Sequence, residues 1–249
     1  MLGEDTLLFT KNGFKTLKEL NLYDEVLTPF GEFEPIVEMG PWEPVDRVMQ
    51  LNTLENIYCS DNLLCYTDLD AKFTYVDDLD CKIAVPFGDI FEFEGDGLNH
   101  PVSNGYDFTV VVPTCIPDAY ILSNLYVKLN CLAGLIDSPI CELGNNDGIY
   151  YFYTEYEDVR RGIITLARSL GFGVKCTCTD GVYAIRVGVD KFIDELPIKD
   201  ELKKCYKPVQ MIRKTGIKNV GYAKNEVMGR KIKVNGSLFL IGYSLVPVA

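Results

Sequence analysis

The pattern of apolar residues changes twice along the chain, and this change constrains the fold most strongly. Residues 1–88 contain short apolar runs separated by turn signals, which is typical of β-structure. After a connector at 89–112, residues 113–206 mix helix-type and strand-type patterns. Residues 207–249 return to strand-type runs. The sequence therefore predicts a β-rich segment at each end of the chain and an α/β region between them.

Composition narrows the class of protein. A hydrophobic content of 47% over 249 residues supports a substantial core, and no apolar run is long enough to span a membrane. The N-terminus lacks the basic and apolar segments of a signal peptide. Nine cysteines without a regular framework fit a reducing compartment such as the cytoplasm. The net charge of −12 disfavours nucleic acid as a partner, because proteins that bind it usually present a basic face.

One motif in the middle region carries a family resemblance. Residues 132–140, Leu-Ala-Gly-Leu-Ile-Asp-Ser-Pro-Ile, resemble the signature of LAGLIDADG homing endonucleases. In that family the motif is a helix whose small residues, here Ala133 and Gly134, pack against a second copy of the motif. Its last acidic residue holds the metal ion that cuts DNA, and Pro139 stands at that position. Because proline offers no oxygen ligand to a hard cation, we expect no metal site. The remaining acid, Asp137, is expected to form hydrogen bonds at the helix end.

The rest of the insert resembles the second half of such an endonuclease. We expect a strand at 150–156 and then a helix that is capped by Asp158 and ends at Gly171. A hairpin follows, with its turn at Asp180–Gly181. The first half of the usual pseudo-dimer is not visible. Gly95-Asp96-Gly97 is either a relic of the first motif or a plain turn, and we favour the turn.

Both ends of the chain contain short ordered blocks, at residues 2–6, 12–15, 20–27 and 57–67 and at 237–240 and 246–249. These blocks resemble those of an intein, which has the Hint (hedgehog/intein) fold. Several ordered blocks carry this resemblance, and in one of them Tyr23 replaces the usual glycine. The resemblance implies a single β-rich Hint domain, formed by residues 1–88 and 207–249 and interrupted by an α/β insert at 113–206.

Protein splicing, the activity of inteins, needs a nucleophile at the first residue, histidines that carry protons, and a terminal asparagine. At these positions the chain has Met1, Leu63, Ser237, Val248 and Ala249. Only Ser237 keeps a hydroxyl group. Met1 could be a start codon or a replacement for cysteine, and Ala249 an engineered substitution, but neither reading explains Leu63 or Val248. We therefore expect no catalytic residue and no cofactor.

Other candidate groups are few. His100 is the only histidine and lies in the connector, so we expect a surface residue and no Ser-His-Asp or Cys-His triad. Cys59 with Cys65, and Cys176 with Cys178, have ligand-like spacings. Because no second pair completes either set, we expect buried free thiols and not zinc ligands.

The strand at 150–156 is rich in tyrosine, and the insert has more acidic than basic side chains. A sheet that faces DNA is expected to be basic. Exposed tyrosines with few charges suit a protein contact, although a simply packed sheet explains the pattern equally well. The surface charge therefore favours a protein partner over DNA.

The sequence thus predicts a non-enzymatic intein-like protein that serves a structural or protein-binding role. Because inteins of this pattern are common in phage genes, we expect proteins of a phage structural assembly as partners, and the cytoplasm or a virion as location. Two alternatives stay open. One is a homing endonuclease that completes its site as a homodimer, and the other is a splicing intein captured with both ends blocked.

Overall fold

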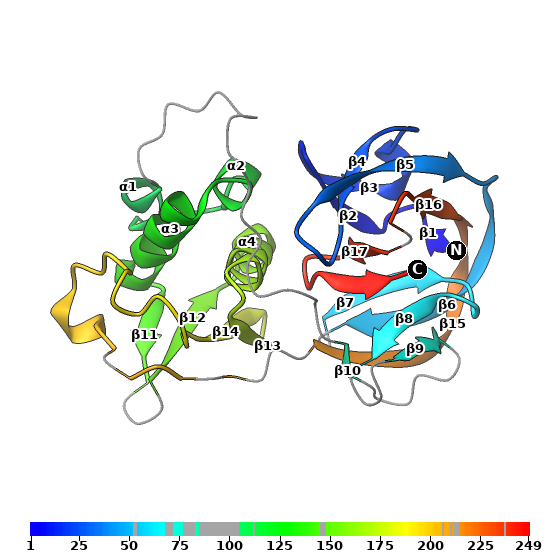
Figure 1. Ribbon diagram of the computed structural model, residues 1–249. Coiled ribbons are helices and arrows are strands. Elements are labelled where there is room, and N and C mark those ends of the chain that lie inside the picture. The colour runs from blue at the N-terminus through cyan, green and yellow to red at the C-terminus, as the bar shows by residue number, and fades with distance from the viewer. Residues whose placement is uncertain are drawn as a thin grey trace. The chain divides into compact units, whose positions relative to one another are not determined.

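The computed structural model divides the chain into two compact units (Figure 1). The terminal unit contains residues 1–88 and 214–249, and the inserted unit contains residues 89–213. No helix in the described part of the chain is long and apolar enough to cross a membrane. The structure describes residues 1–51, 54–67, 72–76, 83–84, 105–111, 113–144, 148–205, 207–209, 211, 215–236 and 238–249.

Strands from both ends of the chain interleave in the terminal unit, and this confirms the predicted architecture. The larger sheet has the order β16-β5-β4-β2-β17-β18-β8-β9, with β3 paired to β2, so β17 and β18 near the C-terminus lie between β2 and β8. These strands are β2 (Leu7–Thr10), β3 (Gly13–Thr16), β4 (Glu25–Leu27), β5 (Phe33–Met39), β8 (Leu64–Thr67), β9 (Lys72–Tyr75), β16 (Ile232–Val234), β17 (Phe239–Ile241) and β18 (Val246–Val248).

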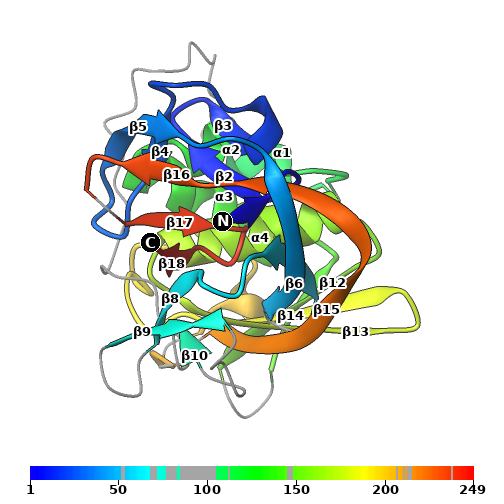
Figure 2. The ribbon, with the colours of Figure 1, turned by 90° about the vertical axis from the view of Figure 1, so that its right-hand side faces the viewer.

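The second sheet of this unit has the order β1-β7-β6-β15-β10. Its longest strand, β15, pairs with β6 through two register shifts, and the two run side by side in Figure 2. One core cluster joins the two sheets, because Met49 and Ile57 of this sheet pack with Leu8 and Val248 of the other. The strands are β1 (Leu2–Gly3), β6 (Glu43–Leu51), β7 (Glu55–Cys59), β10 (Ile83–Ala84) and β15 (Thr215–Arg230).

Tyr23, in the turn that leads into β4, has the backbone conformation of the glycine that the family resemblance expects at this position. Tyr23 has a φ of 72°, in the left-handed region that favours glycine. Its N–H donates to the carbonyl of Ile36 on β5, at 2.9 Å, and its side chain is 72% exposed. The conformation is therefore imposed by the surrounding strands and not by the residue itself. Just before this turn lies a short 3-10 helix, η1 (Leu17–Glu19).

The inserted unit packs helices on one face of a four-stranded antiparallel sheet (Figure 1). The sheet order is β11-β12-β14-β13, and alternate residues such as Tyr150 and Phe152 are buried. The helices are α1 (Tyr106–Thr109), α2 (Asp118–Ile121), α3 (Leu125–Asp137) and α4 (Glu157–Ser169), with a 3-10 turn, η3 (Glu201–Lys203). The strands are β11 (Cys141–Leu143), β12 (Ile149–Thr154), β13 (Gly173–Thr179) and β14 (Val182–Gly188).

The predicted hairpin of the insert is confirmed, since Asp180 and Gly181 both have positive φ, as a tight type I′ turn requires. The predicted cap of the preceding helix, α4, is wrong. Its N-cap residue is Tyr156, whose side chain makes no capping hydrogen bond, and Asp158 lies within the first turn. Acidic residues in that turn still stabilise the helix by facing the positive end of its dipole.

Two segments near the C-terminus differ from the sequence-based expectation. Val209 and Met211 were expected in a strand of the terminal domain, but they pack against Gly148 and Gly188 of the inserted unit. The strand-type run predicted to include Ser244 and Leu245 is wrong at these two residues, which lie in a turn, and β18 begins only at Val246. Both differences arise because tertiary contacts, and not local apolar runs, decide where these residues lie.

Candidate functional site

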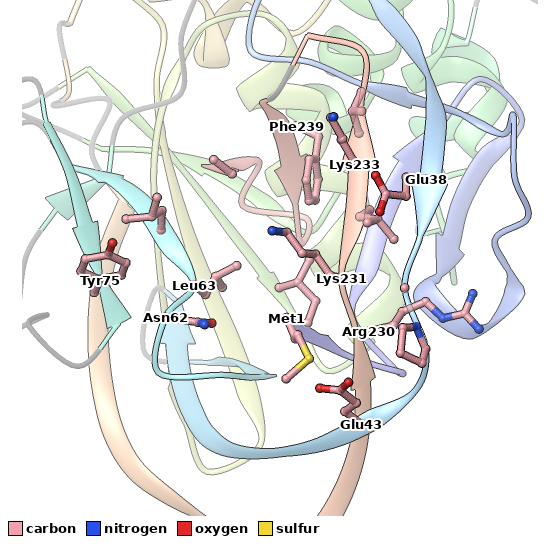
Figure 3. Close-up of a pocket in the computed structure, with 17 residues that line it drawn as sticks. Met1, Glu38, Glu43, Asn62, Leu63, Tyr75, Arg230, Lys231, Lys233 and Phe239 are labelled. Atoms are coloured by element: carbon pink, nitrogen blue, oxygen red, sulfur yellow. The ribbon is translucent and has the colours of Figure 1, made fainter.

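A cavity of about 860 Å³ in the terminal unit gathers positions to which the intein resemblance assigns splicing chemistry (Figure 3). Met1, Leu63 and Ala249 all line it. They come from the start of β1, the turn before β8 and the end of β18, so the interleaved sheet brings together residues that are far apart in sequence. Ser237, another predicted position, lies outside the described residues.

The first residue is held firmly in the cavity wall. Its ammonium group donates to Ser60 Oγ at 2.6 Å, and its carbonyl accepts from the Ser60 N–H at 3.1 Å. Ser60 Oγ in turn donates to Asn62 Oδ1 at 2.6 Å. Burial lowers the pKa of the Met1 ammonium group, with opposing contributions from Cys59 and Asp61. The Met1 side chain is a thioether, which cannot form an acyl intermediate.

Alkyl side chains occupy the positions to which the intein resemblance assigns two histidines and a terminal asparagine. Leu63 is only 4% exposed and belongs to the core cluster. Val248 is fully buried and pairs with Phe239 and Cys65 across the sheet. Ala249 follows it, and its N–H donates to the carbonyl of Leu64 at 3.1 Å. None of these side chains can accept or release a proton near neutral pH.

The thiols of Cys59 and Cys65, in the terminal unit, are protonated at neutral pH and are therefore poor nucleophiles. Burial raises the pKa of Cys59 to about 12, well above the pH at which a thiolate could act as a nucleophile. Burial also raises the pKa of Cys65. In the insert, Cys176 is buried as expected, but Cys178 is exposed, so the prediction of a buried thiol is wrong there. No group of three potential metal ligands occurs in the described part of the chain.

The motif helix α3 of the inserted unit packs against α1 of the same chain. A Cβ atom at Gly134 would lie 2.5 Å from the carbonyl oxygen of Tyr106 and would also collide with Thr109 Oγ1. The Thr109 hydroxyl donates to the carbonyl of Cys131 at 2.9 Å. The small-residue face of the motif, which the family uses for a second copy, is therefore occupied by residues 106–109. No local pattern in the sequence predicts this role of residues 106–109, although the glycine at 105, whose φ is 78°, allows the turn that precedes them.

Asp137 makes the helix-end hydrogen bonds that the sequence analysis expected of it. Its carboxylate accepts from the Tyr106 hydroxyl at 2.6 Å, from the Lys199 N–H at 2.7 Å and from the Asp200 N–H at 3.2 Å. These three donors tie the end of α3 to α1 and to the chain before η3. Pro139 follows two residues later, on the surface. The acid that remains in the motif is thus engaged by the protein itself.

The outer face of the insert's sheet carries a row of polar and aromatic side chains. Glu142, Tyr151, Arg186 and Lys175 are aligned across the four strands. The Arg186 guanidinium lies 5.5 Å from the centre of the Tyr151 ring, and Tyr153 is exposed beside this row. Both His100 and Gly95-Asp96-Gly97 fall outside the described residues.

Comparison with known proteins supports the assignment of the insert. Residues 116–189 match the family model described as "Homing endonuclease", which confirms the predicted character of this part of the chain. No curated protein sequence matches the chain significantly.

Several solved intein structures are similar over nearly the whole chain, at low identity. The Msm DnaB1 intein splicing domain bound with zinc is 11% identical with a TM-score of 0.39, covering 99% of this chain and 98% of that one. The MchDnaB-1 intein is 10% identical with a TM-score of 0.41, covering 100% and 98%. The gp41-1 intein is 10% identical with a TM-score of 0.36, covering 99% and 94%.

Proposed function

We propose that this chain is an intein-like protein with a homing-endonuclease-like insert that has lost both activities and serves a structural or protein-binding role. The observation that carries the proposal is the cavity of the terminal unit. The positions at which splicing would need a nucleophile, a histidine and an asparagine are brought to one place by the fold, and they hold Met1, Leu63 and Ala249. A fold that retains the arrangement of these positions, with unreactive side chains at them, favours a structural or protein-binding role.

The inserted unit supports the same conclusion independently. Metal-assisted cleavage of DNA needs oxygen ligands at the foot of the motif helix. Pro139 supplies none, and the carboxylate of Asp137 is bonded to Tyr106 and to two main-chain N–H groups. Residues 106–109 also cover the face through which a second motif helix would pack. These contacts disfavour an endonuclease that completes its site as a homodimer.

A protein partner suits the exposed face of the insert's sheet. Tyr151 and Tyr153 offer large contact areas with little loss of side-chain entropy, which is why tyrosine is enriched at protein interfaces. The sequence resemblance makes a phage structural assembly the expected setting. Fold alone does not fix this role, so it needs a direct test.

The decisive test places the chain between two reporter proteins and measures ligation of the reporters by mass spectrometry, with an active intein in the same fusion as positive control. We expect only the intact fusion. A second assay incubates the protein with a plasmid library and Mg²⁺, and we expect no nick at a defined sequence. Ligated reporters or a specific nick would refute the proposed loss of activity.

A further inference from the structure

One wall of the cavity is formed by the edge of a sheet. Residues 231–234, which include all of β16, line the cavity. Among the described strands, β16 pairs with β5 alone. Gly40 N–H donates to the carbonyl of Lys231 at 2.8 Å, on the β5 side. In an antiparallel strand the N–H and C=O of successive residues point alternately to the two sides. The N–H and C=O of Ile232 therefore point away from β5.

The side chains of this edge add a basic character that the whole protein lacks. Arg230, Lys231 and Lys233 line the cavity within four residues of sequence, in a chain whose net charge is −12. The Arg230 guanidinium stacks on the Trp42 ring at 3.9 Å. No ion pair joins these three cations to a carboxylate within the described residues. Glu38, opposite Lys233 on β5, and Glu43 are the acidic groups on the same cavity.

The spacing of these cations matches an extended peptide. Lys231 and Lys233 are two residues apart, so they project from the same face of the strand, roughly 6–7 Å apart. Acidic side chains at alternate positions of an added strand have the same period. The residues between them would face an apolar wall that includes Leu63 and Phe239 (Figure 3). A volume of about 860 Å³ falls in the range of roughly 300–1,000 Å³ that is typical of ligand pockets.

We propose that this cavity binds an extended segment of another protein by strand addition to β16, and that it selects segments with acidic residues at alternate positions. Main-chain hydrogen bonds to the side of β16 that faces away from β5 would give affinity, and Lys231 and Lys233 would give selectivity. The inference rests on the proposed protein-binding function and names its partner class. Exposed lysines otherwise protect sheet edges from random pairing, and here they also exclude basic segments.

The test uses the whole chain and fluorescence anisotropy with labelled peptides of about six residues, the common length of a strand. One peptide alternates valine with aspartate, a second alternates valine with lysine, and a third is the first with alternate amides N-methylated. We expect the unmethylated acidic peptide to bind at least about tenfold more tightly than the other two. The lysine peptide carries charges of the wrong sign, and the N-methylated peptide cannot donate the main-chain hydrogen bonds.

Two variants localise the binding. Lys231→Glu combined with Lys233→Glu should weaken the acidic peptide by about tenfold or more and should bind the lysine peptide instead, which also shows that the variant is folded. Lys224→Glu reverses one charge at an exposed position of β15 that does not line the cavity, and it should leave binding unchanged. Equal binding of the N-methylated peptide, or an equal loss in Lys224→Glu, would overturn the proposal. Splicing by the wild-type chain would refute the proposed function but would not alter these binding results.

Discussion

Replacing Tyr23 with glycine is expected to stabilise the protein, although it removes a large side chain. A non-glycine residue in the left-handed region costs about 1–2 kcal/mol, and the φ of 72° places Tyr23 there. Glycine gives back about 0.5–1 kcal/mol through the greater entropy of the unfolded chain. The side chain is 72% exposed, so little buried area is lost. The balance predicts that Tyr23→Gly raises the free energy of unfolding by roughly 0.5–1 kcal/mol.

Urea denaturation measures this difference, and two further variants separate its causes. Tyr23→Ala keeps the Cβ atom and therefore the strain, so it should gain nothing. Leu22→Gly removes a partly exposed apolar side chain at the neighbouring position, where φ is not positive, and should destabilise the protein by about 0.5–1 kcal/mol. If Tyr23→Ala stabilises as much as Tyr23→Gly, the explanation from backbone strain is wrong.

Three other predictions concern packing and buried groups. Gly134→Leu should destabilise the protein by about 1–3 kcal/mol, because its side chain would collide with Thr109; equal stability in urea would contradict the packing of α1 on α3. Asp137→Ala should cost about 1.5–3 kcal/mol, since three donors lose a charged acceptor, and calorimetry should detect no change in Mg²⁺ binding. Burial raises the pKa of Cys59 to about 12, so the unfolded thiol ionises first and its contribution to stability falls as pH rises above about 8.5. Mass spectrometry after alkylation at pH 8 should find exposed Cys178 modified and Cys59 intact in the native protein.

Local sequence patterns predicted the strands that have clear apolar runs and turn residues. The hairpin around Asp180–Gly181 is one example, because two residues with positive φ define a tight turn without help from the rest of the fold. Strand β15 was not predicted. Its exposed residues, such as Val220 and Tyr222, give no clean alternation, and pairing with β6 holds it in place.

The sequence predicted the residues of the candidate site only at the positions to which the family resemblance assigns splicing chemistry. That resemblance pointed to Met1, Leu63 and Ala249, and the structure brings these three to one cavity. The cover of α3 by residues 106–109 was not predictable, because it depends on the contact of Gly134 with a segment far away in sequence and with no apolar helix pattern of its own. The position of β16 at the edge of the sheet, among the described strands, likewise follows from strand order, which local patterns do not determine.

The burial of Leu63, at the position to which the intein resemblance assigns a histidine, leads to a last prediction. The position is 4% exposed within an apolar cluster, so Leu63→His would bury a polar ring and leave its nitrogens without assured partners, at a cost of about 1–3 kcal/mol.

The stability of Leu63→His should also depend on pH. Burial lowers the pKa of a histidine, so protons bind the unfolded chain more readily, and the variant should lose further stability as pH falls below about 6.5. Thermal melting between pH 8 and pH 5, compared with the wild type, measures this slope. An equal pH dependence in both proteins would mean that the ring is solvated or paired. The cavity would then accommodate the splicing histidine readily, and replacing it with leucine would have brought the core no gain in stability.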